Sequence, residues 1–189
     1  MIEIVFHGRG GQGAVTAVQI LAEAAFLEGY HAQAFPRFGI ERRGAPVAAY
    51  ARIGTEPIQI RGQIVQTDFS IVGDMMAIAP MILFKSMKEN GTIIINTVRS
   101  REHLQGYGRS WERPDLKFFT IGATEISRKV YGEKSIPITS VAMLGAFCAA
   151  SNLVQLHSIT AALAHFFPPV LLKKNTEAAR LAFEEVRGT

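Results

Sequence analysis

The strongest constraint on the fold of this chain is a glycine-rich hexapeptide that lies between an apolar run and an alanine-rich run. The apolar run, residues 2–6, is typical of a central parallel strand that is buried on both faces. Residues 14–27 carry small and apolar side chains at helical spacing, so we expect a helix there. A strand, a glycine turn and a helix in this order aim backbone N–H groups and a helix N-terminus at one point, which attracts phosphate. The hexapeptide is Gly8-Arg9-Gly10-Gly11-Gln12-Gly13.

Short apolar runs and amphipathic runs predict the other elements. We expect strands at residues 31–35, 46–53, 57–60, 69–72, 92–95 and 117–121, and helices at residues 75–87, 124–131, 141–150, 158–166 and 171–187. Only three residues join the runs at 46–53 and 57–60, so this pair is expected to form an antiparallel hairpin.

These elements predict an α/β fold. We expect three α/β/α layers, a Rossmann-like start and a mixed, mostly parallel sheet that contains one antiparallel hairpin. No internal repeat, low-complexity tract or linker interrupts the chain, so residues 1–189 are expected to form a single domain.

A second loop, residues 36–45, is rich in glycine and arginine and follows the second expected strand. In a parallel unit this loop leaves the carboxyl end of its strand, which is the edge that also carries the first glycine loop. Arginine makes fixed, bidentate contacts with phosphate or carboxylate. Both loops are therefore expected at the edge where ligands of open α/β sheets bind.

Two familiar nucleotide motifs fit the first loop incompletely. Its glycines have the G-x-G-x-x-G spacing, but the second strand ends in Phe35-Pro36-Arg37, where a dinucleotide site has an acidic residue. This disfavours NAD and leaves NADP open, since an arginine there could receive a phosphate. The P-loop interpretation fails because Ala14-Val15 follows the loop in place of lysine and a hydroxyl residue.

Composition excludes several classes of function. The 189 residues are 48% hydrophobic and 19% charged, which is typical of a globular protein, and no apolar run reaches the roughly 20 residues of a membrane span. A net charge of +4 without a dense lysine run argues against nucleic acid. The single cysteine, Cys148, excludes an internal disulfide and a cysteine-bound Fe–S cluster held by this chain alone. We expect it to be a buried, small apolar residue.

The sequence contains no complete catalytic or metal site. Its histidines lack ligand spacing, and no Ser/His/Asp arrangement is present, so we expect neither a catalytic residue nor a metal ligand. Asp74 follows an expected strand and is interpreted as a helix N-cap. The chain opens directly with an expected strand, which leaves no room for a signal peptide, so we expect a cytoplasmic protein.

Four stretches together resemble the gamma component of the 2-oxoacid:ferredoxin oxidoreductases. They are the glycine loop with its alanine-rich helix, the motif FGIERRGAPV at residues 38–47, the small-residue run at 140–147 and the last helix at 174–185. The Ala45-Pro46 form of the second motif is most similar to the pyruvate and branched-chain 2-oxoacid group. The resemblance covers nearly the whole chain.

The resemblance implies a subunit that is not catalytic alone. The complex would decarboxylate pyruvate or a branched-chain 2-oxoacid oxidatively to an acyl-CoA and reduce ferredoxin. Thiamine diphosphate and Fe–S clusters would belong to partner subunits, one of them ferredoxin-like, while the gamma component would help to bind CoA at a shared site. The CoA-binding residues implied are Gly8, Arg9, Gly10, Gly11, Gln12, Gly13, Arg42, Arg43 and Gly44.

Other interpretations stay open at this point. The glycines could serve only as a tight turn and Arg43 could contact a neighbouring subunit, which would make the chain an assembly scaffold. A free-standing oxidoreductase that binds NADP or flavin is a further alternative. The sequence also leaves open whether the isolated chain forms a homodimer.

Overall fold

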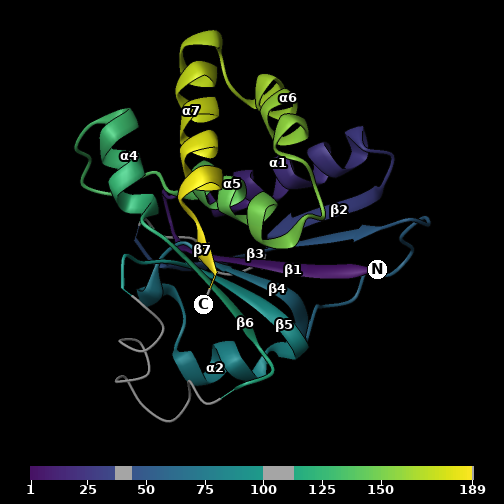
Figure 1. Ribbon diagram of the computed structural model, residues 1–189. Coiled ribbons are helices and arrows are strands. Elements are labelled where there is room, and N and C mark those ends of the chain that lie inside the picture. The colour runs from purple at the N-terminus through teal and green to yellow at the C-terminus, as the bar shows by residue number, and fades with distance from the viewer. Residues whose placement is uncertain (37–43, 100–112, 189) are drawn as a thin grey trace.

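The computed structural model describes residues 1–36, 44–99 and 113–188. It contains a mixed sheet of seven strands in the order β2-β3-β1-β4-β5-β6-β7 (Figure 1). The strands are β1 (Ile2–Arg9), β2 (His31–Pro36), β3 (Pro46–Gly54), β4 (Thr67–Val72), β5 (Met87–Asn96), β6 (Lys117–Ile121) and β7 (Arg187–Gly188). The α/β class with a mixed sheet is thus confirmed.

Strands β1, β4, β5 and β6 are parallel neighbours and form the centre of the sheet. Strand β3 is antiparallel to both β1 and β2 and lies between them, so β2 runs in the same direction as β1. The β1–β3 register extends over the whole of β1, from Ile2 opposite Ile53 to Arg9 opposite Pro46. The carboxyl ends of β1, β2 and β4 therefore lie at one edge of the sheet.

The predicted hairpin between residues 46–53 and 57–60 is wrong. The first run is strand β3, but residues 57–60 form no strand. The side chains of Gln33 and Arg52 in the sheet donate hydrogen bonds to backbone carbonyls of this segment. Those carbonyls therefore do not pair with another strand. The partners of β3 are instead two strands that precede it in the chain.

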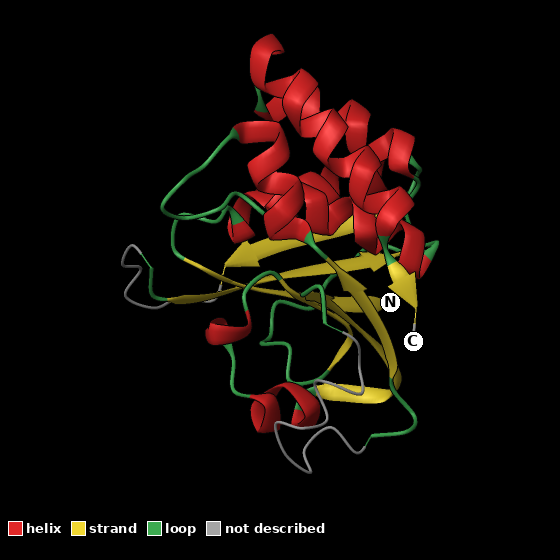
Figure 2. Ribbon diagram, turned by 60° about the vertical axis from the view of Figure 1, so that its left-hand side comes forward, coloured by secondary structure: helices red, strands yellow, loops and turns green. Residues whose placement is uncertain are grey.

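Helices cover the two faces of the sheet unequally (Figure 2). On one face α1 packs against β1, β2 and β3, and α5 packs against β5 and β6. On the other face lie two short segments, η1 and α2. No helix of the described residues is long and apolar enough to span a membrane. The helices are α1 (Ala14–Leu27), η1 (Met75–Ala77), α2 (Pro80–Lys85), α4 (Ala123–Tyr131), α5 (Ser140–Ser151), α6 (Leu156–Phe166) and α7 (Pro169–Glu185).

The strand side chains alternate between the two cores of the molecule. Ile94 of β5 joins the core under the helix layer, while its neighbours Ile93 and Ile95 join the smaller core with Leu83 of α2. Successive side chains of a strand point to opposite faces, and both faces are buried here. The strand runs are therefore apolar throughout.

The predicted helix at residues 75–87 is too long. A single turn of 3-10 helix is followed by α2, which starts with Pro80 at its first position, and Met87 already belongs to β5. Asn90 has φ 59 inside that strand. Pro80 separates η1 from α2, because the residue before a proline avoids helical backbone angles.

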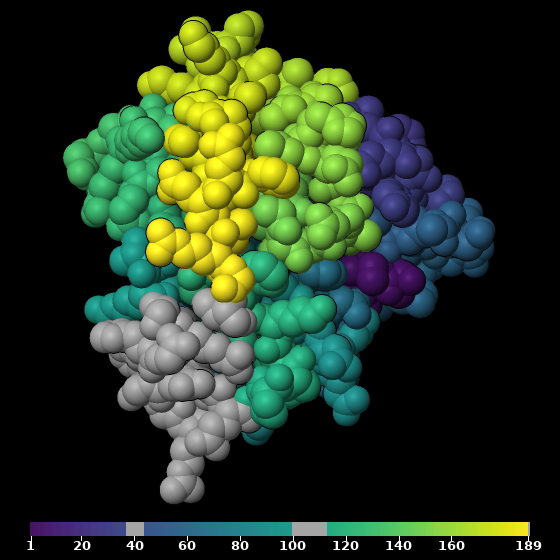
Figure 3. Space-filling model, viewed as in Figure 1, coloured from purple at the N-terminus to yellow at the C-terminus, as the bar shows by residue number. Residues whose placement is uncertain are grey.

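Helices α5 and α7 make the closest packing in the helix layer. Gly145 of α5 faces the backbone of Ala179 in α7, where a Cβ at position 145 would overlap the Ala179 carbonyl oxygen. The small residue at position 145 therefore permits this close packing. Helix α7 in turn lies beside α6, and the two form the upper surface in Figure 3.

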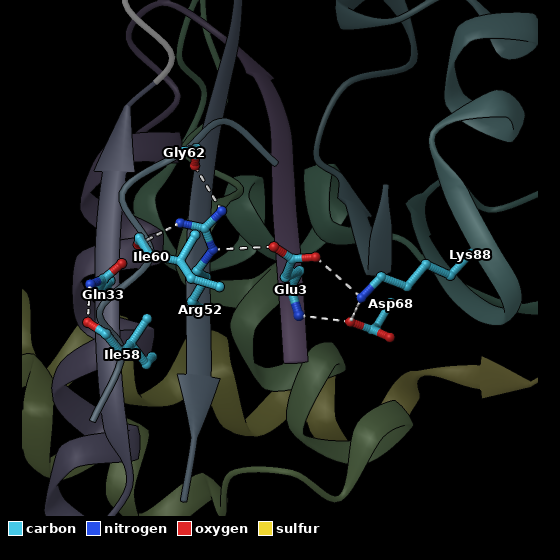
Figure 4. A network of polar contacts seen from close by, with 8 residues as sticks. All are labelled: Glu3, Gln33, Arg52, Ile58, Ile60, Gly62, Asp68 and Lys88. Carbon is cyan, nitrogen blue, oxygen red and sulfur yellow. Dashed lines mark hydrogen bonds and ion pairs between the residues drawn. The ribbon is translucent and has the colours of Figure 1, made fainter. Parts of the chain in front are cut away.

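A polar network at the amino end of β1 holds the segment after β3 in place (Figure 4). The guanidinium of Arg52, which is 1% exposed, donates to the carbonyls of Ile60 at 3.0 Å and Gly62 at 2.8 Å, and its Nε donates to Glu3 at 3.2 Å. The Gln33 amide donates to the Ile58 carbonyl at 2.8 Å. Three alternate carbonyls of an extended segment are therefore bound by side chains of β2 and β3.

Lys88 completes the network on its other side. Its ammonium lies 3.2 Å from Glu3 and 2.8 Å from Asp68, and the Asp68 carboxylate also accepts the backbone N–H of Glu3 at 2.7 Å. The Glu3 carboxylate thus lies between two cations, which offsets the cost of its partial burial.

We predict that the Arg52→Gln variant exposes residues 57–62 to protease, because glutamine reaches fewer of these carbonyls and carries no charge. In limited digestion with trypsin, the first cut is expected after Arg61, several-fold faster than in the parent protein. The Arg180→Gln variant on exposed α7 is the matched control and is expected to leave that rate unchanged. An unaltered rate after Arg61 in Arg52→Gln would contradict this role.

Candidate functional site

The glycine loop has the conformation that its sequence predicts. Strand β1 ends at Arg9, helix α1 begins at Ala14, and Gly13 is the N-cap with φ 85. The Gln12 N–H donates to the Arg9 carbonyl at 2.9 Å, which closes the turn. The strand, the turn and the helix start are thus confirmed as one continuous unit.

The loop lies where the strand order of the sheet reverses. From β1 the chain passes through α1 to β2 on one side, whereas β4, β5 and β6 follow on the other side of β1. The Gly73 N–H after β4 donates to the His7 carbonyl at 2.8 Å, so the carboxyl ends of β1 and β4 are adjacent. In open α/β sheets, ligands bind in the crevice at this point.

The second motif reaches the glycine loop. The Gly10 N–H donates to the Ala45 carbonyl at 2.8 Å, and the Gly44 N–H donates to the Gly10 carbonyl at 3.0 Å. The expectation that both loops share one edge of the sheet is therefore confirmed for Gly44. Arg42 and Arg43 lie outside the described residues, so their predicted part in the site stays a prediction.

A compact polar cluster joins the loop to the start of η1. The Asp74 carboxylate accepts hydrogen bonds from Arg9 Nε at 2.6 Å, from Gln12 Nε2 at 3.1 Å and from the Met76 N–H at 2.9 Å. The Gln12 Oε1 accepts the backbone N–H of Arg9 at 2.7 Å. The N-cap role predicted for Asp74 is confirmed.

The loop side chains differ in their access to solvent. Gln12 is 3% exposed and its polar atoms are used inside the protein, so it shapes the loop. The Arg9 side chain is 39% exposed, although an ion pair with Asp74 partly neutralises it. Arg9 is therefore the loop side chain that can reach a ligand. The sequence did not reveal the link to Asp74, although its place directly after β4 could have suggested it.

A second helix begins at the same place. Ser140, the first residue of α5, lies so close to Gly13 that a Cβ at position 13 would stand 2.8 Å from its hydroxyl oxygen. The N-termini of α1 and α5 thus meet at the loop. Each N-terminus carries a partial positive charge of roughly half an elementary charge, so both favour an anion here. The sequence predicts only a helix at residues 141–150 and no part in the site.

A second group of charged side chains lies at the opposite edge of the sheet. A hollow of about 750 Å³ at the amino ends of β5 and β6 is lined by Lys85, Lys88, Arg113 and Asp115. Arg113 binds Asp115 at 2.6 Å, and this hydrogen bond lowers the pKa of the Asp115 carboxyl to about 2. Lys88 is occupied by Asp68 and Glu3. We therefore place the candidate site at the glycine loop, at the other edge of the sheet.

The described residues hold no group of three or more His, Cys, Asp or Glu side chains that could bind a metal ion. Cys148 lies buried in α5, as predicted, and burial raises the pKa of its thiol to about 12. At neutral pH this thiol stays protonated and inert.

The family of the chain follows from comparison with known proteins. Residues 3–185 match the family described as pyruvate ferredoxin/flavodoxin oxidoreductase. The chain belongs to this family. A relative from Pyrococcus abyssi, named pyruvate/ketoisovalerate oxidoreductases common subunit gamma, is 46% identical over 187 residues, which cover 99% of this chain and 98% of the relative. The resemblance found in the sequence is thereby confirmed.

Two solved structures share the fold of this chain. A pyruvate oxidoreductase subunit, PORC, from Thermotoga maritima superimposes with a TM-score of 0.81 at 32% identity and covers 100% of this chain and 98% of its own. The 2-oxoglutarate:ferredoxin oxidoreductase from Magnetococcus marinus superimposes with a TM-score of 0.74 at 16% identity, covering 97% of this chain and 31% of that chain. The second likeness shows the fold alone.

We predict that the Gly13→Ala variant loses more stability than Gly11→Ala. Both positions have positive φ, 85 and 95, so alanine costs about 1–2 kcal/mol at either one. Only at position 13 does the new Cβ also crowd Ser140, which adds about 1–3 kcal/mol. Unfolding in urea measures both losses, and equal losses would contradict the close contact between the two helix starts.

Proposed function

We propose that this chain is the gamma subunit of a multi-subunit 2-oxoacid:ferredoxin oxidoreductase that acts on pyruvate or a branched-chain 2-oxoacid. The observation that carries the proposal is the 46% identity to a common gamma subunit over nearly the full length of both chains. The likeness is therefore not confined to the glycine loop, which alone would fit many nucleotide-binding folds.

In this proposal the chain carries neither the thiamine diphosphate nor the Fe–S clusters of the complex. Fe–S clusters are held by several cysteine thiolates, and this sequence has one cysteine, which lies buried in α5. Partner subunits would hold these cofactors and perform the decarboxylation and the electron transfer to ferredoxin. The gamma subunit would contribute binding and orientation.

We further propose that the glycine loop binds phosphate groups of CoA. CoA carries a pyrophosphate and a 3′-phosphate, which suit the donors present here. These are the backbone N–H groups of the loop, two helix N-termini and the half-exposed Arg9. In this proposal Arg42 and Arg43, which lie outside the described residues, add further donors. Gly44, held against Gly10, would form a second wall. A partner subunit would complete this shared site.

The assembly proposal predicts the partners of the chain. When the tagged chain is purified from its native host without oxygen, we expect a thiamine-diphosphate subunit and an Fe–S subunit in near-equal amounts. Bound thiamine diphosphate and iron, measured in the eluate, identify them. Recovery of the chain alone, or with a bound nucleotide, would contradict the proposal and favour the free-standing oxidoreductase.

The CoA proposal predicts a selective kinetic change in the assembled complex. Arg43→Ala is expected to raise the KM for CoA about tenfold, the effect of losing one charge-assisted hydrogen bond, and to leave the KM for the 2-oxoacid unchanged. Arg180→Ala, on an exposed face of α7, is the matched control. Equal changes in both KM values, or no change in either, would argue for a scaffold whose loop binds no ligand.

A further inference from the structure

Asp74 is the residue that ties the glycine loop to the neighbouring strand. It lies two residues after the end of β4, and its side chain is 13% exposed. Two of its three hydrogen bonds come from side chains of the loop, Arg9 and Gln12. The third, from the Met76 N–H, fixes the carboxylate itself.

The contact with Asp74 restricts the Arg9 side chain to one orientation. Asp74 accepts Arg9 Nε at 2.6 Å, and within the described residues the terminal nitrogens of Arg9 make no hydrogen bond. These nitrogens carry most of the N–H donors of a guanidinium group. Because the side chain is 39% exposed, a ligand at the loop can reach it. An arginine fixed in this way loses less conformational entropy when an anion binds.

The same carboxylate fixes the Gln12 amide. Since Asp74 accepts from Gln12 Nε2, the amide oxygen of Gln12 is turned towards the backbone N–H of Arg9, which it accepts at 2.7 Å. Gln12 is 3% exposed, so water cannot replace these bonds easily. Asp74 therefore controls both the side chain of Arg9 and the backbone that leads into the loop.

We propose that Asp74 is a positioning residue for phosphate binding at the glycine loop. By holding Arg9 and Gln12, it presents the donors of the loop in one arrangement to a phosphate group of CoA. This inference rests on the proposed function of the loop. The negative charge of Asp74 itself opposes an anion, but the pairing of its carboxylate with Arg9 reduces this repulsion.

The Asp74→Asn variant of the assembled complex tests this role. Asparagine has the same size and can still cap η1 by accepting from Met76, but it has lost the charge that holds Arg9. We expect the KM for CoA to rise about tenfold, with the loss confined to CoA and absent from the KM for the 2-oxoacid. A fall in the KM for CoA would overturn the inference, because it would mean that the carboxylate merely repels the ligand. An unchanged KM would overturn it as well, because Asp74 would then have no influence on CoA binding.

A double-mutant cycle distinguishes positioning from a general structural role. Arg9→Ala removes the group that Asp74 positions, so adding Asp74→Asn in that background is expected to change the KM for CoA much less than tenfold. If the two effects multiply in full, Asp74 does not act through Arg9 and the inference is wrong.

Asp115→Asn is the matched control. It breaks another Arg–Asp pair with a shortest distance of 2.6 Å, at the opposite edge of the sheet, and is expected to leave the KM for CoA unchanged. The test also separates the two proposals. If Arg9→Ala raises the KM for CoA and Asp74→Asn does not, only the positioning role fails. If neither Arg9→Ala nor Arg43→Ala raises it, CoA binding at this loop fails.

Discussion

The pairing of β3 with the whole of β1 is the interaction on which the arrangement of this site depends. The register places Pro46 opposite Arg9, at the last residue of β1. The residues just before Pro46 must then run beside the glycine loop, and Gly44 and Ala45 make backbone hydrogen bonds to Gly10 there. A crossover helix in place of β3 would have carried the second motif elsewhere. The two motifs meet because an antiparallel strand was inserted between two strands of equal direction.

Much of this site was predictable because its signals are local. The order of strand, glycine turn and helix follows from residues 2–27, and the shared edge of the two loops follows from strand direction. The insertion of β3 was not predictable, since residues 46–53 look the same whichever strand they pair with. The false hairpin has a related cause, because residues 57–60 have an apolar pattern but their carbonyls bind Gln33 and Arg52.

The parts of the site that the sequence did not reveal are all contacts between distant residues. Asp74 lies 65 positions from Arg9, and Ser140 lies still further from Gly13. Neither residue type nor spacing predicts such contacts. An aspartate after a strand is most simply interpreted as a helix cap. Only the sheet order, which brings the ends of β1 and β4 together, makes Asp74 part of the loop.

The loop combines backbone N–H donors of fixed geometry with Arg9, whose charge is partly neutralised by Asp74. Such a site does not attract anions by net charge alone, because the ion pair with Asp74 reduces the charge of Arg9. It favours a ligand that matches the geometry of its N–H groups and of the two helix N-termini. This property is what the proposed role of the loop in CoA binding requires.

The most direct measurement is a structure of the assembled complex with CoA bound. We predict that a phosphate group of CoA lies within hydrogen-bond distance of the backbone N–H groups of the glycine loop, and that the terminal nitrogens of Arg9 face it while Asp74 still holds Nε. If every phosphate of CoA instead contacts other subunits, and the loop contacts only protein, CoA binding by this chain is contradicted.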